Sequence, residues 1–172
     1  MNNTQHDFDD GNGPVPAHQH PNGGGWVANT ASVAETAFIG KYAKVYGKAK
    51  VLDNAKVYGY AKVYGYAKVF GHARVDDKAK VYGKAWVFGN AWVHHSVNVC
   101  GYASVYGNTE VFNNAKVFDN AKVFGNAKVY GDAWVFGLAK VYHSARVCEY
   151  ASVCGKAEVF DDAQVTECKV YS

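Results

Sequence analysis

A six-residue repeat runs from Ala31 to Ala163 and restricts the fold of this chain more than any other feature. It comprises 23 hexapeptides without insertion or deletion, of which Ala-Lys-Val-Tyr-Gly-Lys (43–48) is typical. The first position is Ala in 21 units, and the third position is Val in 22. The chain holds 26 Val and 24 Ala but only two Leu and one Ile. Since helices favour Leu, Met, Glu and Gln, this composition argues against an all-α fold.

Side-chain alternation along an extended backbone predicts which positions face inward. The first and third positions point to one side and the second and fourth to the other. If the Lys and Tyr positions faced inward, a column of unpaired charge would be buried at high cost. Ala and Val are therefore expected inside, and the fifth and sixth positions form a turn in which Gly supplies positive φ. A core this narrow predicts three hexapeptides per turn, so residues 18 apart stack.

The pattern resembles the left-handed parallel β-helix of hexapeptide-repeat proteins, as in Val-Phe-Gly-Asn-Ala-Lys (123–128). The stretch His20–Gly40, HPNGGGWVANTASVAETAFIG, is similar to the opening of small hexapeptide-repeat proteins of bacteriophages and bacteria. The resemblance implies an all-β, triangular solenoid of about eight 18-residue coils and a homotrimer. It also implies kinship with acyltransferases and zinc carbonic anhydrases, whose loops shape a substrate cleft. The unbroken repeat leaves no such loop, which favours a protein without catalytic activity.

Three regions are expected. Residues 1–24 form an arm or cap over the first coil, residues 25–168 form the β-helix, and residues 169–172 form a tail. The glycines at 23–25 are expected to act as a hinge, and Trp26 to plug the first core layer. The arm also carries an His-x-His pair, His18 and His20, which in a trimer could hold a metal ion around the axis.

Charge is unevenly distributed along the chain. Residues 1–40 carry four acidic residues and no Lys or Arg, whereas residues 41–84 carry 11 Lys or Arg and three Asp, a net charge of +8. This asymmetry predicts either a surface that binds anions or an acidic arm that folds back onto the basic segment. The candidate ligand-binding residues are Lys62, Lys68, Arg74, Lys80, Trp86, Trp92 and Asn113. Their chemistry suggests an anionic small molecule, a nucleotide or single-stranded nucleic acid.

One unit departs most from the repeat, because AWVHHS places His94 and His95 where an aromatic residue and Gly usually stand. Asp76 and Asp77 occupy the same two positions one coil below. An Asp could orient a His for general-base catalysis or metal binding, which makes these four residues catalytic candidates. The alternative is a polar corner in which Asp–His hydrogen bonds replace Gly turns.

The fourth position is aromatic in 14 of 23 units. On one face this predicts a ladder of stacked rings, formed by Phe70, Phe88, Tyr106, Phe124, Tyr142 and Phe160. Exposed rings on this scale are expected to pack against sister subunits. The four Cys fit no metal spacing. With an N-terminus that does not resemble a secretory signal and no long apolar run, they predict free thiols, no membrane association and a location in the cytoplasm or a virion.

Three functions are compatible with these features. The first is a non-catalytic β-helix that binds a ligand or serves as a structural part; if a phage encodes it, it would be a virion component or a host-interaction protein. The second is an acyltransferase-like enzyme with an intersubunit site at His94 or His95. The third is capture of nucleotides or nucleic acid on residues 41–84. No cofactor is expected.

Overall fold

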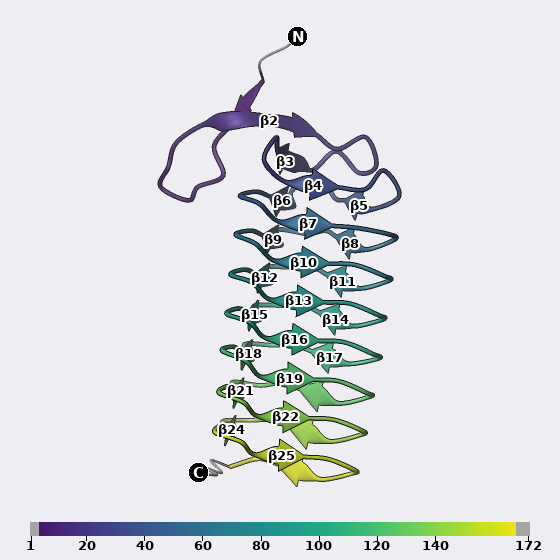
Figure 1. The fold of residues 1–172 in the computed structure, drawn as a ribbon, viewed down its shortest axis with the longest axis vertical. Helices are drawn as coiled ribbons and strands as arrows, with labels where there is room; N and C mark the ends of the chain where they lie inside the picture. Colours follow the sequence, from purple (N-terminus) through teal and green to yellow (C-terminus); the bar gives the residue numbers. More distant parts are fainter. Residues whose placement is uncertain (1–3, 168–172) are drawn as a thin grey trace.

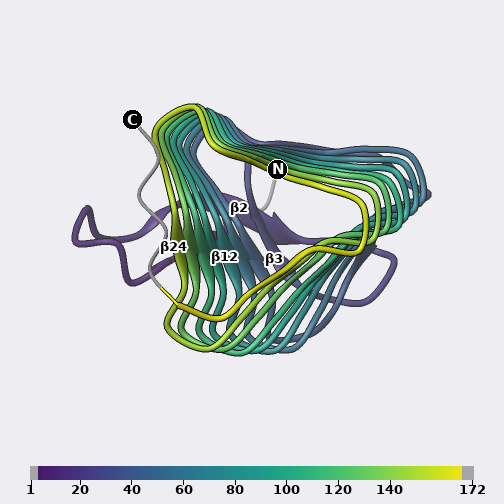
Figure 2. The same cartoon turned by 90° about the horizontal axis from the view of Figure 1, so that it is seen from below.

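The chain is a parallel β-solenoid with three flat faces. The computed structural model describes residues 4–167, and these residues contain 26 strands and no helix, so none of them forms a membrane-spanning helix. Successive coils lie directly above one another along the long axis (Figure 1). Viewed along that axis, the coils superpose in a rounded triangle that turns slightly from one end to the other (Figure 2). The described part of the expected β-helix region, 25–167, has this architecture. Its predicted end at 168 and the tail at 169–172 lie outside the described residues.

The strands form three sheets. The first sheet contains β1 (Gln5–His6), β2 (Val15–Gln19), β3 (Trp26–Ala28), β6 (Lys44–Val45), β9 (Lys62–Val63), β12 (Lys80–Val81), β15 (Asn98–Val99), β18 (Lys116–Val117), β21 (Trp134–Val135) and β24 (Ser152–Val153). The second contains β4 (Ser32–Val33), β7 (Lys50–Val51), β10 (Lys68–Val69), β13 (Trp86–Val87), β16 (Ser104–Val105), β19 (Lys122–Val123), β22 (Lys140–Val141) and β25 (Glu158–Val159). The third contains β5 (Phe38–Ile39), β8 (Lys56–Val57), β11 (Arg74–Val75), β14 (Trp92–Val93), β17 (Glu110–Val111), β20 (Lys128–Val129), β23 (Arg146–Val147) and β26 (Gln164–Val165).

The register confirms the predicted 18-residue coil. In the second sheet, for example, Lys68 pairs with Lys50 in the preceding coil and with Trp86 in the following coil. Ala and Val of the first and third positions fill the interior, and from Ala37 to Val153 all of them are fully buried. The fifth position has positive φ throughout the regular coils, which explains its Gly, Asp and Asn residues. At Gly83 an added Cβ would also lie 3.0 Å from the amide nitrogen of Gly101 in the next coil.

The fourth position forms columns of stacked rings at the corners. The predicted ladder of six rings from Phe70 to Phe160 is present, with centroids 4.7 to 5.5 Å apart and planes within 18°. A second column runs through Tyr46, Tyr64 and Tyr82, is interrupted at Cys100, and continues with Phe118 and Phe136. Most of these rings are only half-exposed because each ring covers its neighbours.

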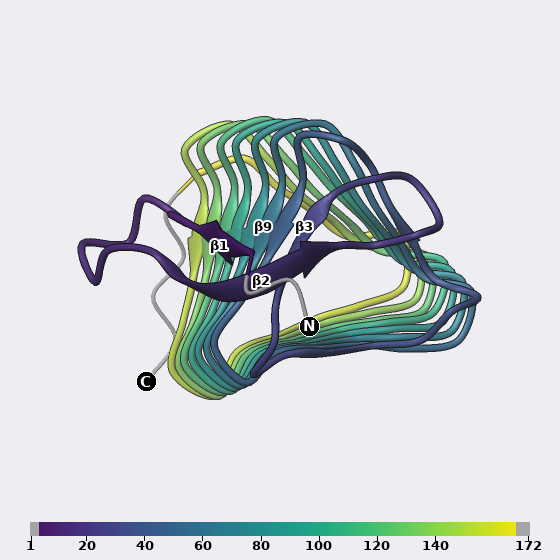
Figure 3. The same ribbon diagram turned by 90° about the horizontal axis from the view of Figure 1, so that it is seen from above.

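The N-terminal arm folds back onto the first coils. β1 and β2 form an antiparallel hairpin, and β2 pairs with β3, so the hairpin lies across the end of the solenoid (Figure 3). Phe8 is buried against Tyr46, with ring centroids 4.9 Å apart. Asp9 accepts a hydrogen bond from Lys44 Nζ at 2.5 Å, as expected for an acidic arm that folds onto the basic segment.

The expectation that Trp26 plugs the core is wrong. Trp26 occupies an outward-facing second position and pairs with Lys44 of the following coil. Its indole packs against His6, with ring centroids 4.3 Å apart. The neighbouring Val27 enters the core instead. Strand alternation accounts for the difference, because adjacent side chains of β3 must point to opposite faces.

Candidate functional site

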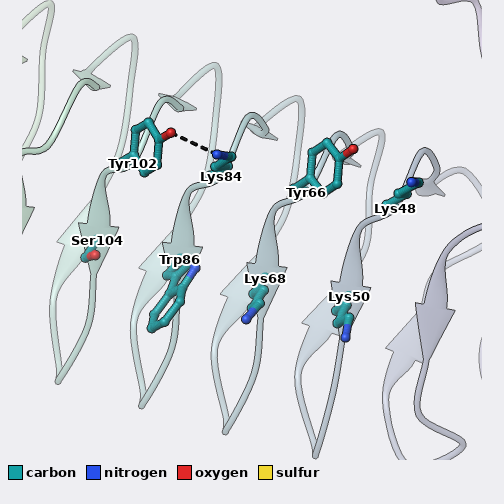
Figure 4. A pocket seen from close by; sticks show the side chains of 8 residues that line it. All are labelled: Lys48, Lys50, Tyr66, Lys68, Lys84, Trp86, Tyr102 and Ser104. Atoms are coloured by element: carbon teal, nitrogen blue, oxygen red, sulfur yellow. Dashed lines mark hydrogen bonds between the residues drawn. The ribbon is translucent and has the colours of Figure 1, made fainter.

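A groove of about 450 Å³ crosses four neighbouring strands of the second sheet, β7, β10, β13 and β16. We call it the Lys–aromatic groove; its lining residues are Lys48, Lys50, Tyr66, Lys68, Lys84, Trp86, Tyr102 and Ser104. They form two parallel columns, one on the strands and one on the turns that precede them (Figure 4). The two columns face the same side because each turn residue stands two positions before its strand partner.

Each aromatic ring of the groove is in contact with a lysine of the preceding coil. Lys68 Nζ lies 4.7 Å from the centroid of Trp86, and the corresponding distances are 5.6 Å for Lys48 over Tyr66 and 4.8 Å for Lys84 over Tyr102. Lys84 Nζ also donates a hydrogen bond to the Tyr102 hydroxyl at 2.9 Å (Figure 4). This hydrogen bond raises the pKa of Lys84 above its ordinary value and so favours the ammonium form. The groove therefore presents fixed positive charges beside aromatic rings.

On the side of the following coil, Trp86 has only a small residue as its neighbour. Ser104 pairs with Trp86 in the next coil, at a position that is usually Lys. The Trp86 side chain is accordingly 43% exposed. Of the described residues that line the groove, four are lysines and none carries a carboxylate. Such a site can hold an anion on the ammonium groups while a planar ring lies on the indole.

The same Lys–Trp–Ser stack occurs once more, on the first sheet. Lys116 Nζ lies 4.6 Å from the centroid of Trp134, and Ser152 pairs with Trp134 in the following coil. Trp134 is 42% exposed. Its turn column differs, because Asn114 and Asp132 are hydrogen-bonded there at 3.1 Å. Trp134 therefore reproduces the local packing of Trp86 without the lysine-rich turn column.

The ligand-binding residues expected from the sequence are distributed over three faces. Only Lys68 and Trp86 line the groove. Lys62 and Lys80 lie on the first sheet, where Lys62 Nζ donates to the carbonyl oxygen of Phe8 in the arm at 3.4 Å. The rest occupy the third face: Arg74 and Trp92 stack on β11 and β14, and Asn113 lies in the turn after β17. The other six lining residues were not singled out from the sequence. Lys48, Lys50, Tyr66 and Lys84 fall within the predicted segment 41–84, whereas Tyr102 and Ser104 fall outside it. Pairing residues two apart across successive 18-residue coils would have found all six.

The four catalytic candidates do meet at one corner, which we call the His–Asp corner (Asp76, Asp77, His94 and His95). Asp77 Oδ2 accepts a hydrogen bond from the backbone N–H of His95 in the following coil, at 3.1 Å. Asp76 Oδ2 accepts one from the indole N–H of Trp92 at 3.0 Å. Neither hydrogen bond reaches an imidazole ring, so neither one orients a His ring as expected. Asp53 and Asp119 bind the amides of Gly71 and Gly137 in the way Asp77 binds His95, so this is a recurrent turn contact.

The two histidines have different environments. His94 is 7% exposed, and its ring lies between Trp92 and Phe112, with centroids 4.2 and 5.4 Å away. Its Nε2 lies 3.4 Å from Oε1 of Glu110. Burial alone would raise the pKa of Glu110, but the hydrogen bonds of Lys128 and His94 bring it below its ordinary value. His95 is exposed, at a φ of 60°.

The His-x-His pair of the arm is separated by its surroundings. The exposed His18 has its Nδ1 2.9 Å from Oδ1 of Asn29. His20 is buried, with Nδ1 3.3 Å from the carbonyl oxygen of Asn22. Within the described residues of one chain, neither belongs to a group of three metal-ligating side chains. The metal site around a trimer axis stays a prediction.

Comparisons with protein-family models, with curated proteins and with solved structures found no significant match for this chain.

Proposed function

We propose that this chain is a non-catalytic, left-handed hexapeptide-repeat β-helix that binds nucleotide units in the Lys–aromatic groove. The ligand is an anion with a planar base, either a free nucleotide or part of a single-stranded nucleic acid. One observation carries the proposal: four lysines and three aromatic rings share a groove that no carboxylate of the described residues lines.

The two halves of such a ligand match the two kinds of groove residue. Phosphate oxygens pair with the ammonium groups of Lys48, Lys50, Lys68 and Lys84, and the base stacks on Trp86 over the gap left by Ser104. Stacking of a base on an aromatic side chain contributes about 1–3 kcal/mol and tolerates any base. Two lysines of the first sheet, Lys44 and Lys62, are less accessible because the arm engages them. The second sheet is therefore the favoured basic face.

Binding without catalysis agrees with the side chains present. The groove is lined by lysine, tyrosine, tryptophan and serine, and its described lining holds no His or carboxylate that could act as a general base on Ser104. At the His–Asp corner, His94 is enclosed between two rings rather than placed in a cleft. The acyltransferase alternative, the homotrimer and the role as a phage component or host-interaction protein stay predictions. So does the cytoplasmic or virion location.

Isothermal titration of the protein with oligo(dT), ATP and inorganic tripolyphosphate tests the proposal. We expect oligo(dT) and ATP to bind with an affinity that falls as salt rises, because ligand binding displaces counterions. Tripolyphosphate should bind more weakly than ATP, since it lacks the base. Trp86→Ala should weaken ATP binding by about tenfold, the equivalent of about 1.4 kcal/mol of lost stacking.

Trp134→Ala is the matched control. Each indole has one lysine partner, Lys68 for Trp86 and Lys116 for Trp134, and the two are nearly equally exposed, so both substitutions remove similar packing. Only Trp86→Ala should affect binding. Equal losses in the two variants, equal affinity for ATP and tripolyphosphate, or no binding of any probe at low salt would each refute the proposal.

A further inference from the structure

We infer that Asp77, His94 and His95 form a binding site for a divalent transition-metal ion of the zinc type. One carboxylate oxygen and one imidazole nitrogen from each His lie within 4.8 Å of one another. The site is separate from the Lys–aromatic groove, since none of its residues lines that groove.

The donor set suits such an ion. Two imidazoles and one carboxylate are ligands that zinc accepts, with bonds of about 2.0–2.2 Å, and water can complete the coordination. Bonds of this length place neighbouring ligand atoms about 3.3 Å apart in a tetrahedral site. The three side chains must therefore move closer together, and two of them, Asp77 and His95, are exposed and can rotate. Asp77 accepts the amide of His95 through Oδ2, and a carboxylate has a second oxygen for an ion.

The surroundings hold His94 in place and supply negative charge. A metal-bound His usually donates its other ring N–H to a carboxylate, and Glu110 stands in that relation to Nε2 of His94 at 3.4 Å. This arrangement leaves Nδ1 of His94 as the ligand atom. Trp92 and Phe112 restrict the ring from both sides.

Asp76 is an independent indication of a cation at this corner. The residue is 5% exposed, Oδ2 accepts the Trp92 indole N–H, and the Tyr58 phenol is a close neighbour, yet the buried Oδ1 has no partner at hydrogen-bond geometry among the described residues. Burying a carboxylate oxygen without a partner is unfavourable, and a cation nearby reduces that cost. Asp76 is the sequence neighbour of Asp77 and lies in the coil that precedes the coil of His94.

The repeat itself supplies substitutions that remove the ligands without damaging the fold. An aromatic residue is the usual occupant of the fourth position, so His94→Phe continues the column of Phe112 and Tyr130, whose rings stack 4.8 Å apart. Gly is the usual occupant of the fifth position, where His95 has a φ of 60° that favours glycine. Both variants should melt no lower than the unsubstituted protein in the absence of metal.

Calorimetric titration of untagged, chelator-treated protein with ZnCl₂ tests the site, and the visible spectrum of the Co²⁺ complex reports its ligands. We expect one ion per chain and a rise in melting temperature with zinc. His94→Phe, His95→Gly and Asp77→Asn should each weaken binding at least tenfold. His143→Asn is the control, since His143 forms a similar corner pair with Asp161 at 2.8 Å but has Tyr142 before it; its affinity should stay within twofold.

Two results would overturn the inference. One is a protein that binds neither zinc nor cobalt. The other is binding that survives both His94→Phe and His95→Gly, which would place the ion elsewhere, for example on a cysteine.

Discussion

The rings of Tyr64 and Tyr82 stack with centroids 4.9 Å apart and planes 2° apart, and the next place in their column is held by Cys100. Phe118 and Phe136 resume the stack beyond this gap. A single small side chain therefore divides one aromatic column into two.

Filling this gap should stabilise the protein. Cys100→Phe would create stacks with Tyr82 and Phe118, each worth about 0.5–1.5 kcal/mol beyond the area buried. Urea unfolding followed by circular dichroism measures the change. Cys100→Ala removes the thiol without adding a ring and serves as the reference. The column would contribute no pairwise stacking energy if the Phe variant were no more stable than the Ala variant.

Thr109 is a second position at which the chain is less stable than its repeat allows. It takes the place of the inward Ala, is 1% exposed, and its hydroxyl has no hydrogen-bond partner among the described residues. Since an unsatisfied buried polar group costs about 1–3 kcal/mol, Thr109→Val should raise the free energy of unfolding by about 1 kcal/mol. Val97 shows that the first position accommodates Val, because it is fully buried there.

Thr109→Ser separates the hydroxyl from the methyl group. This variant keeps the unpaired hydroxyl and loses packing, so it should be less stable than the unsubstituted protein. Chemical denaturation of all three proteins in parallel would decide the point, and a Val variant that is the least stable of them would contradict it.

Ionisation of Tyr58 should lower the free energy of unfolding at alkaline pH. Burial and the neighbouring Asp76 raise the pKa of the Tyr58 phenol from 10.0 to about 12. A raised pKa in the folded state means that the neutral phenol stabilises the fold fully below pH 10, and that this contribution is lost between pH 10 and about 12.

Replacement of this tyrosine should make the alkaline loss shallower. Tyr58→Phe keeps the ring and removes the ionisable group, so its free energy of unfolding should decline less steeply between pH 10 and pH 12 than that of the unsubstituted protein. Unfolding midpoints in urea across this range provide the measurement. Parallel curves for the two proteins would show that Tyr58 does not titrate as stated.

Much of the fold was predictable because the repeat makes the same physical demand 23 times. Only the Ala and Val positions can be buried at low cost, which assigns the inner face and the strand direction of every unit. The stacking of residues 18 apart followed, and with it the ladder from Phe70 to Phe160 and the meeting of Asp77 with His95. Trp26 was misplaced although the phase of the repeat, continued back to residue 25, assigns it to an outward second position and Val27 to an inward third position.

The candidate sites were predictable only in part. Lys68, Trp86 and the His–Asp corner were selected as departures from the repeat or as basic and aromatic residues. Their partners are ordinary repeat residues such as Lys48 and Lys50, which nothing in a single hexapeptide marks as functional.

The sequence alone determined the number of residues per coil and which side chains face the interior, because both depend on local alternation and on the cost of burying charge. The tertiary structure decided which surface residues act together. The turn column beside Trp86 holds lysines, whereas the one beside Trp134 holds the hydrogen-bonded pair Asn114 and Asp132. Whether His94 contacts Asp76 or Glu110 likewise depends on how the side chains of neighbouring coils are arranged. These contacts arise between coils, so they exist only once the chain has wound around its three faces.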